Sequence, residues 1–156
     1  MRPLELRISG LHSYAEEQVV DFAALSAYGI FGIFGPTGSG KSTILDAVIL
    51  ALFGEMPRAS HGTLGIINQN AARAAVSFTF EAGRGPKRRR YRVERVLKRS
   101  GDYGAVTHRS RLVQVSGEGE EVLADRDGSV KAMVQEILGL TADDFTRAAV
   151  LPQGRF

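Results

Sequence analysis

Nine consecutive residues, from Gly35 to Thr43, have the types and the spacing of a phosphate-binding loop. They fit the pattern G-x-x-x-x-G-K-[ST], in which glycines let backbone N–H groups converge on phosphates, the lysine adds positive charge and the hydroxyl binds Mg²⁺. The pattern therefore predicts a site for a nucleoside triphosphate with Mg²⁺ bound to the Ser42 hydroxyl. The predicted nucleotide-binding residues are Gly35, Pro36, Thr37, Gly38, Ser39, Gly40, Lys41, Ser42 and Thr43.

The residues on both sides of this loop predict the elements that position it. The apolar run 29–34 predicts a buried strand that leads into the loop. After the loop, Gly54 stands where a helix that starts at Ser42 would be capped. The apolar residues between them recur at helical spacing, at Ile44, Leu45, Val48, Ile49 and Leu52. The unpaired N–H groups and the dipole at the start of that helix favour a bound anion.

Upstream of the loop, the sequence predicts two edge strands. Residues 4–8 alternate apolar and charged side chains, the period of a strand buried on one face. Val19, Val20 and Phe22 predict a second strand that pairs back on the first. Downstream of the helix, residues 55–73 form a long irregular stretch, which favours a functional loop.

The C-terminal half predicts an antiparallel β-meander and two helices. Turn signals separate four predicted strands, at 76–81, 90–98, 111–115 and 122–124. A helix is expected from Asp127 or Ser129 to Gly139. Thr141 and Asp144 match a capping box for a short helix, and residues 148–151 predict a final strand.

Composition limits the class of protein. The chain has 156 residues, 44% of them hydrophobic, which predicts one domain over 1–156 with a single core. It has no cysteine and three scattered histidines, so neither disulfides nor a zinc site is expected. The chain shows no signal-peptide pattern and no apolar run of membrane-spanning length, which predicts a cytoplasmic protein without a membrane partner.

Two parts of a hydrolytic P-loop site are missing from the sequence. The acidic strand that supports Mg²⁺ is matched only by Val122 to Asp125, which is too short and lies in the meander. Residues 115–119 resemble the signature sequence of ATP-binding-cassette proteins, but they fit a hairpin turn better. No N-K-x-D run marks guanine recognition, so ATP is the expected nucleotide. The sequence predicts a site that binds the nucleotide but lacks the groups for its hydrolysis.

Three segments together resemble the N-terminal ATPase lobe of the SbcC family, the bacterial counterpart of the ATPase in the Rad/Mre break-repair complexes. They are residues 4–14, the P-loop with its helix, and the ending Val150-Leu151-Pro152-Gln153-Gly154-Arg155-Phe156. The resemblance covers essentially the whole chain. It implies an α/β fold, an ATP-binding-cassette half-head with a mixed sheet around the P-loop helix and an attached antiparallel β-meander.

The resemblance also implies site residues and partners. Gln153 would sense Mg²⁺ and the γ-phosphate. Ser13 and His12 would lie near the adenine and ribose, and Ile67 and Gln69 would flank the base. The missing parts would come from a C-terminal lobe beyond a coiled coil. Two composite heads would close around two ATP molecules, with the SbcD nuclease and DNA as partners, in the cytoplasm at the nucleoid.

A basic run in the meander has two interpretations. Residues 84–99 hold nine basic residues and one acidic residue, which leaves the rest of the chain with a net charge of −5. Lys87, Arg88, Arg89 and Arg90 are the candidates for contact with DNA phosphates. The alternative is a solvated edge strand whose charges prevent edge-to-edge pairing.

Two other functions remain open from the sequence alone. A head lobe of the chromosome-maintenance or RecN group would keep ATP and DNA but change the partner. A self-contained small P-loop kinase would need a mobile lid and a substrate pocket, neither of which the meander supplies in recognisable form.

Overall fold

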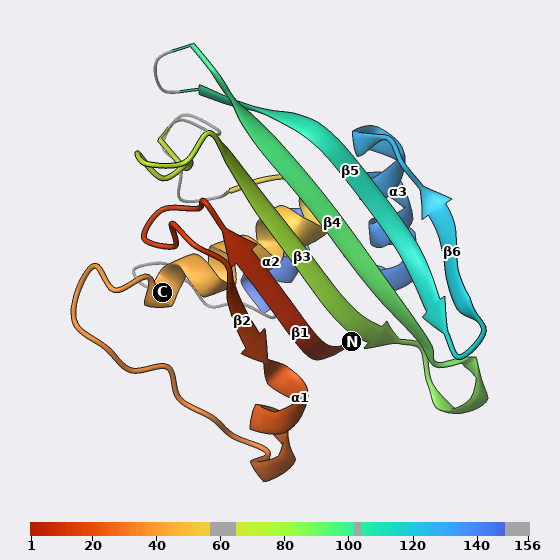
Figure 1. Cartoon of the computed structure of the whole chain (residues 1–156). Coiled ribbons are helices and arrows are strands. Elements are labelled where there is room, and N and C mark those ends of the chain that lie inside the picture. Colours follow the sequence, from red (N-terminus) through yellow and green to blue (C-terminus); the bar gives the residue numbers. More distant parts are fainter. Residues whose placement is uncertain (57–64, 102–103, 149–156) are drawn as a thin grey trace.

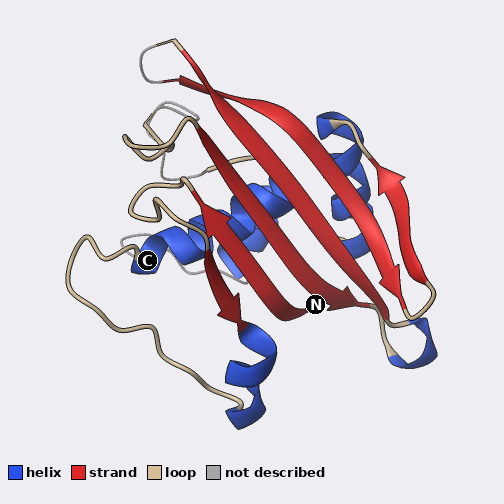
Figure 2. Ribbon diagram, in the orientation of Figure 1, coloured by secondary structure: helices blue, strands red, loops and turns tan. Residues whose placement is uncertain are grey.

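The protein is one twisted sheet with helices packed on one of its faces (Figure 1; Figure 2). The computed structural model describes residues 1–56, 65–101 and 104–148. The strands are β1 (Arg2–Ser9), β2 (Gln18–Asp21), β3 (Arg73–Ala82), β4 (Arg89–Ser100), β5 (Gly104–Ser116) and β6 (Gly119–Ala124). The helices are α1 (Phe22–Leu25), α2 (Lys41–Phe53), α3 (Asp127–Leu138) and α4 (Ala142–Ala148), with 3₁₀ turns at η1 (Ser26–Tyr28) and η2 (Gly85–Lys87).

The sheet has the order β2-β1-β3-β4-β5-β6, and every described pairing is antiparallel. The predicted β-meander is confirmed, because β3 to β6 are joined in sequence by turns and lie side by side. The predicted mixed sheet is wrong for the part of the chain that the structure describes. The prediction depended on residues 29–34 joining the sheet as a parallel strand, and these residues are not part of the sheet.

The apolar run 29–34 is an extended, irregular loop instead of a buried strand (Figure 1). Ile30 and Phe34 are 89% and 93% exposed, whereas the ring of Phe31 lies 5.9 Å from that of Phe22 in the core. A strand with an apolar run on both faces needs neighbours that cover both faces. Within the described sheet, the edge strand next to β1 is β2, which has only four residues and is therefore shorter than the run.

The two N-terminal strands form as predicted, with two corrections. β1 is an interior strand between β2 and β3, so only β2 is an edge. Phe22 is the first residue of α1 rather than the end of a strand, because the Asp21 carboxylate accepts a hydrogen bond of 2.9 Å from the Ala24 N–H and starts a helix there.

The core lies between the sheet and α2. Alternate residues of the strands point into it, among them Leu6 and Ile8 of β1 and Phe78 and Phe80 of β3. The predicted P-loop helix is confirmed and ends at Gly54, which caps it in the left-handed conformation. Most residues of α2 are buried, so its buried face is wider than the predicted apolar stripe. Leu45 was predicted to belong to that stripe but lies on the exposed side of the helix.

The two C-terminal helices follow their sequence signals. α3 runs from Asp127 to its cap at Gly139, and α4 begins with the predicted capping box. There the Asp144 carboxylate accepts hydrogen bonds from the Thr141 N–H and hydroxyl, which lowers the pKa of Asp144. Ala148 ends α4, so it is not part of a strand, and the rest of the strand predicted at 148–151 lies outside the described residues. None of the described helices combines the length and hydropathy that crossing a membrane requires.

Candidate nucleotide-binding site

The predicted phosphate-binding loop lies at the N-terminus of α2, on the surface of the protein (Figure 1). Gly40 precedes the helix in the left-handed conformation, with φ of 90°. A Cβ atom at Gly40 would lie 2.8 Å from the Tyr14 ring, so a larger residue would be both strained and crowded there. The glycine therefore lets the loop turn tightly onto the helix while an aromatic ring packs below it.

Lys41 holds the loop in shape. Its Nζ donates hydrogen bonds to the carbonyl oxygens of Gly35 at 2.8 Å and Pro36 at 2.7 Å. An ammonium group has three donors, so one remains for a phosphate oxygen. The lysine thus closes the loop around the position where the phosphates of a nucleotide would sit, at the positive end of α2.

The two residues after Lys41 differ in exposure. Ser42 is exposed at the first turn of α2, where its hydroxyl is open to a metal ion bound to the phosphates. Thr43 is buried against the core, so its side chain supports the helix more than it faces the loop. An Mg²⁺ ion prefers oxygen ligands, and the exposed Ser42 hydroxyl fits that requirement.

The turn between β1 and β2 contacts the loop directly. The Ser13 hydroxyl donates a 2.9 Å hydrogen bond to the Gly38 carbonyl, and the Tyr14 hydroxyl donates one of 3.2 Å to the Gly40 carbonyl. Partial burial raises the pKa of Tyr14, which keeps its hydroxyl protonated as a donor. The structure thus places the predicted Ser13 at the loop, and it adds Tyr14, which the sequence analysis missed.

A second segment supports that turn. Residues 66–70 lie against it through hydrogen bonds from the Asn68 side chain to the His12 carbonyl at 2.6 Å and from the His12 N–H to the Ile66 carbonyl at 2.8 Å. Arg99 of β4 holds this segment in turn, because its guanidinium donates to the Asn68 carbonyl at 2.7 Å. His12 has a positive φ of 45°, rare for a residue with a side chain, and these contacts hold it there.

The other residues predicted to contact the nucleotide differ in how exposed their side chains are. His12 and Gln69 are exposed on the segments just described, whereas Ile67 is 5% exposed and belongs to the hydrophobic core. Ile67 therefore supports the β1–β2 turn. Its side chain is in the core, and its backbone forms an antiparallel β-bridge with Leu11. Gln153 lies outside the described residues.

The start of the basic run, Lys87 to Arg90, lies at the other end of the sheet, whereas Arg99 at its end contacts the segment just described. Arg2 of β1 pairs with Glu81 of β3, whereas the far end of β1 leads to the turn at the phosphate-binding loop. A strand of eight residues separates the two places, roughly 20 Å. The basic residues therefore form a surface distinct from the candidate nucleotide site.

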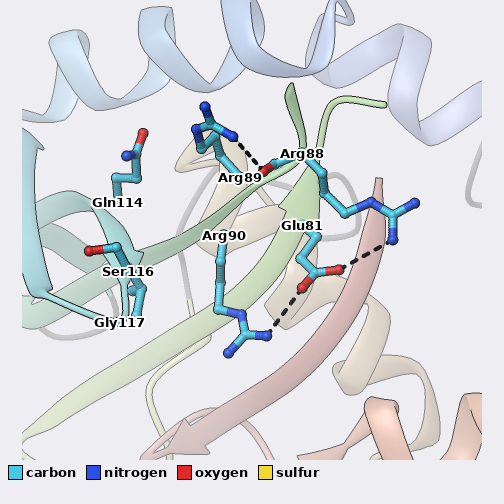
Figure 3. Close-up of a pocket in the computed structure, with 8 residues that line it drawn as sticks. Glu81, Arg88, Arg89, Arg90, Gln114, Ser116 and Gly117 are labelled. Carbon is cyan, nitrogen blue, oxygen red and sulfur yellow. Dashed lines mark hydrogen bonds and ion pairs between the residues drawn. The ribbon is translucent and has the colours of Figure 1, made fainter. Parts of the chain in front are cut away.

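Figure 3 shows how these basic side chains lie around a cavity of about 610 Å³. Arg88 and Arg90 point toward the same carboxylate, that of Glu81, at 3.9 and 3.1 Å. Arg89 turns to the opposite side of the strand and donates to the Pro86 and Arg88 carbonyls. Lys87 ends the 3₁₀ turn beside them. One carboxylate among these four basic residues leaves the cluster with a net positive charge.

The family of the chain follows from comparison with known proteins. A family model described as an AAA domain matches residues 5–156. The chain belongs to the AAA domain family. AAA domains are ATPase domains, so membership agrees with the loop geometry in indicating a nucleotide-binding protein.

Known relatives of this AAA domain chain include DNA-repair proteins. The chain is 52% identical to the SbcC subunit of the SbcCD nuclease of Bacillus subtilis and 46% identical to the protein of that name in Clostridium acetobutylicum. It is 35% identical to a Probable DNA double-strand break repair Rad50 ATPase of Aquifex aeolicus. Each match covers 100% of this chain but only 13 to 15% of the relative. The resemblance to the SbcC family is confirmed over the whole chain, and the chain spans about one seventh of the length of these relatives.

Proposed function

We propose that this AAA domain chain is the ATP- and Mg²⁺-binding N-terminal lobe of an SbcC-type protein, acting in a nuclease complex that processes DNA ends and hairpins. The observation that carries the proposal is the loop geometry. Lys41 closes the phosphate-binding loop, while Ser13 and Tyr14 fix its carbonyls from a neighbouring turn. The 52% identity to the SbcC protein of a known SbcCD nuclease supports the choice of this ATPase family over a kinase.

Each residue of the site has a role in binding. Backbone N–H groups of the loop surround the phosphates, and the free donor of Lys41 bonds an oxygen at the β/γ end. Ser42 and Gln153 hold Mg²⁺, which neutralises phosphate charge when bound. Ser13, with its hydroxyl already engaged by Gly38, places the β1–β2 turn beside the nucleoside, and exposed His12 and Gln69 border the same surface.

The exposed apolar run 29–34 supports the half-head part of the proposal. Ile30 and Phe34 have almost no cover, yet the run leads straight into the phosphate-binding loop. A C-terminal lobe of the same protein would supply neighbouring strands and bury this run. The composite head would then pair with a second head around two ATP molecules and act with an SbcD-type nuclease.

Thermal unfolding with and without nucleotide tests the proposal. A ligand that binds only the folded state at 100 times its Kd adds about 2.7 kcal/mol of stability, which raises the Tm of a chain of this size by roughly 5 to 10 °C. We expect this rise with Mg-ATP, and a smaller one with Mg-GTP at the same concentration. If the Tm does not move with either nucleotide at millimolar concentration, this chain has no nucleotide site.

The basic end of the sheet is proposed to contact DNA. Changing Lys87, Arg88, Arg89 and Arg90 to glutamine is expected to weaken DNA binding by the SbcC-type complex for every sequence tested. The slope of log affinity against log salt should become shallower by about 0.9 for each phosphate that the variant no longer neutralises. Salt titrations of the variant and the parent complex on one duplex measure this directly.

A matched variant controls for the change in charge alone. Arg73, Lys98, Arg109 and Arg126 are exposed basic residues of the described chain outside residues 87–90. Their change to glutamine removes the same charge and is expected to leave the salt slope nearly unaltered. β4 is an interior strand between β3 and β5, so the edge-strand interpretation is wrong, and equal slopes for the two variants would instead make these residues a solvated surface without DNA contact.

A further inference from the structure

Arg95 is the largest fully buried side chain of the described protein, with 1% of its surface exposed. It lies in the middle of β4 and points to the side of the sheet where α2 packs. A charged group in such a place is costly unless its donors are all directed at acceptors. The partners of its guanidinium therefore show what holds this part of the fold together.

On one side, Arg95 binds the last turn of the P-loop helix. Its Nε donates to the Ala51 carbonyl at 2.8 Å, and one Nη donates to the Leu52 carbonyl at 3.3 Å. The last carbonyls of a helix lack partners within the helix and carry its negative dipole end, so a cation is well placed there. A Cβ atom at the capping Gly54 would come within 3.1 Å of the guanidinium, which the glycine avoids.

On the other side, Arg95 binds the start of α3. Its second Nη donates to the Ser110 hydroxyl at 2.9 Å and forms an ion pair with the Asp127 carboxylate. The Ser110 hydroxyl also donates to that carboxylate, at 2.6 Å. Burial lowers the pKa of Arg95, and the charge of Asp127 opposes that shift. Asp127 is the first residue of α3, so one guanidinium links the end of α2 to the beginning of α3.

We propose that Arg95 and Asp127 are positioning residues that couple the P-loop helix to α3, so that nucleotide binding at one end of α2 changes the protection of α3. The inference rests on the proposed nucleotide site. α2 is a rod of about 20 Å with the phosphate-binding loop at its start and Arg95 at its end. Movement of the rod therefore shifts the carbonyls that Arg95 holds.

The C-terminal helices are placed to receive that movement. α3 starts on Asp127, and the Phe145 ring of α4 lies 5.5 Å from the Phe53 ring at the end of α2. In sequence, α4 ends five residues before Gln153, the predicted γ-phosphate residue. The coupling thus runs from the phosphate-binding loop along α2 to α3.

Amide hydrogen exchange, followed by mass spectrometry on the 156-residue chain, tests the coupling. In the parent protein, Mg-ATP is expected to slow exchange at least twofold in peptides of both α2 and α3. In Asp127→Asn, we expect the α2 response and a Kd for Mg-ATP within threefold of the parent, but no α3 response. Asp125→Asn removes the same charge two residues earlier and is expected to behave as the parent. A purely structural ion pair would change basal exchange without removing the response to nucleotide.

A nucleotide-free arm separates this inference from the proposed function. Gly40→Ala crowds Tyr14 at the loop end of α2 and is expected to speed α3 exchange in the parent background but not with Asp127→Asn. If Mg-ATP slows exchange in no peptide, the proposed nucleotide site is wrong, and the effect of Gly40→Ala on α3 exchange then tests the coupling by itself.

Two results would overturn the coupling. One is an α3 response that persists in Asp127→Asn, and the other is a parent protein whose α3 exchange changes neither with Mg-ATP nor with Gly40→Ala.

Discussion

Replacing Lys41 with alanine is expected to weaken Mg-ATP binding roughly 10- to 150-fold, because a charge-assisted hydrogen bond is worth about 1.5–3 kcal/mol. In the structure, Lys41 bonds the Gly35 and Pro36 carbonyls and retains one donor for the nucleotide. The substitution therefore removes a phosphate contact and the brace that closes the loop. Both losses weaken nucleotide binding, so calorimetric titration with Mg-ATP measures them together.

The fold is expected to survive this change. The two carbonyls that Lys41 leaves are exposed and bond to water instead, at little cost. Lys131→Ala serves as the control, since that lysine pairs with Glu55 on the surface between α3 and the end of α2. An unchanged ATP affinity for Lys41→Ala, with the control also unchanged, would remove the phosphate-binding loop from the proposed function.

Local patterns in the sequence were sufficient to predict most elements of this fold. The alternation in residues 4–8 and in β3 reports a sheet with one buried face, and Gly54 and Gly139 mark helix ends through conformations that glycine adopts at low cost. The Thr141–Asp144 capping box forms through contacts within one turn. Each of these signals lies within a few residues of the structure that it predicts.

Long-range pairing could not be predicted in the same way. The run 29–34 has the composition of a buried strand, but a strand also needs partners, and composition does not say where these lie. For the same reason β1 was predicted to be an edge strand. In the structure its second side pairs with β3, which lies about 70 residues later in the sequence. The mixed sheet was wrong for this reason.

The candidate site shows a similar division. The spacing of the phosphate-binding loop is a local pattern and predicts Lys41 and Ser42 directly, whereas Tyr14, Asn68 and Arg99 act through single hydrogen bonds to distant backbone carbonyls. Such single bonds produce no repeating pattern of residue types, so the sequence alone does not reveal them. Arg95 was counted only as one charge of a basic run, although its position opposite Val76 on the pleated strands places it beneath the sheet.

The largest expected effect concerns turnover: this chain alone is expected to bind Mg-ATP but to hydrolyse it at a rate near background. Hydrolysis by a P-loop protein needs a supported Mg²⁺, a positioned water and stabilisation of charge on the transferring phosphoryl group, and each contributes orders of magnitude in rate. In the proposed function, Lys41, Ser42 and Gln153 would meet part of this requirement. The acid that supports the metal, the carboxylate that orients water and the opposing signature loop are all assigned to the C-terminal lobe and the second head.

Adding the C-terminal lobe is therefore expected to restore hydrolysis, with a rate that rises as the square of head concentration, because the composite site needs two heads. Ile30→Asp and Phe34→Asp are expected to abolish this restoration and leave the Tm of the chain alone unchanged, since both side chains are exposed here. Val106→Asp, at an exposed apolar position on β5, is the matched control and is expected to hydrolyse ATP as the parent does. Phosphate release assays across these mixtures decide the matter. If the chain alone turns over ATP at about 1 s⁻¹ or faster, the ordinary range for an enzyme, the half-site explanation is wrong and a self-contained P-loop enzyme becomes the better one.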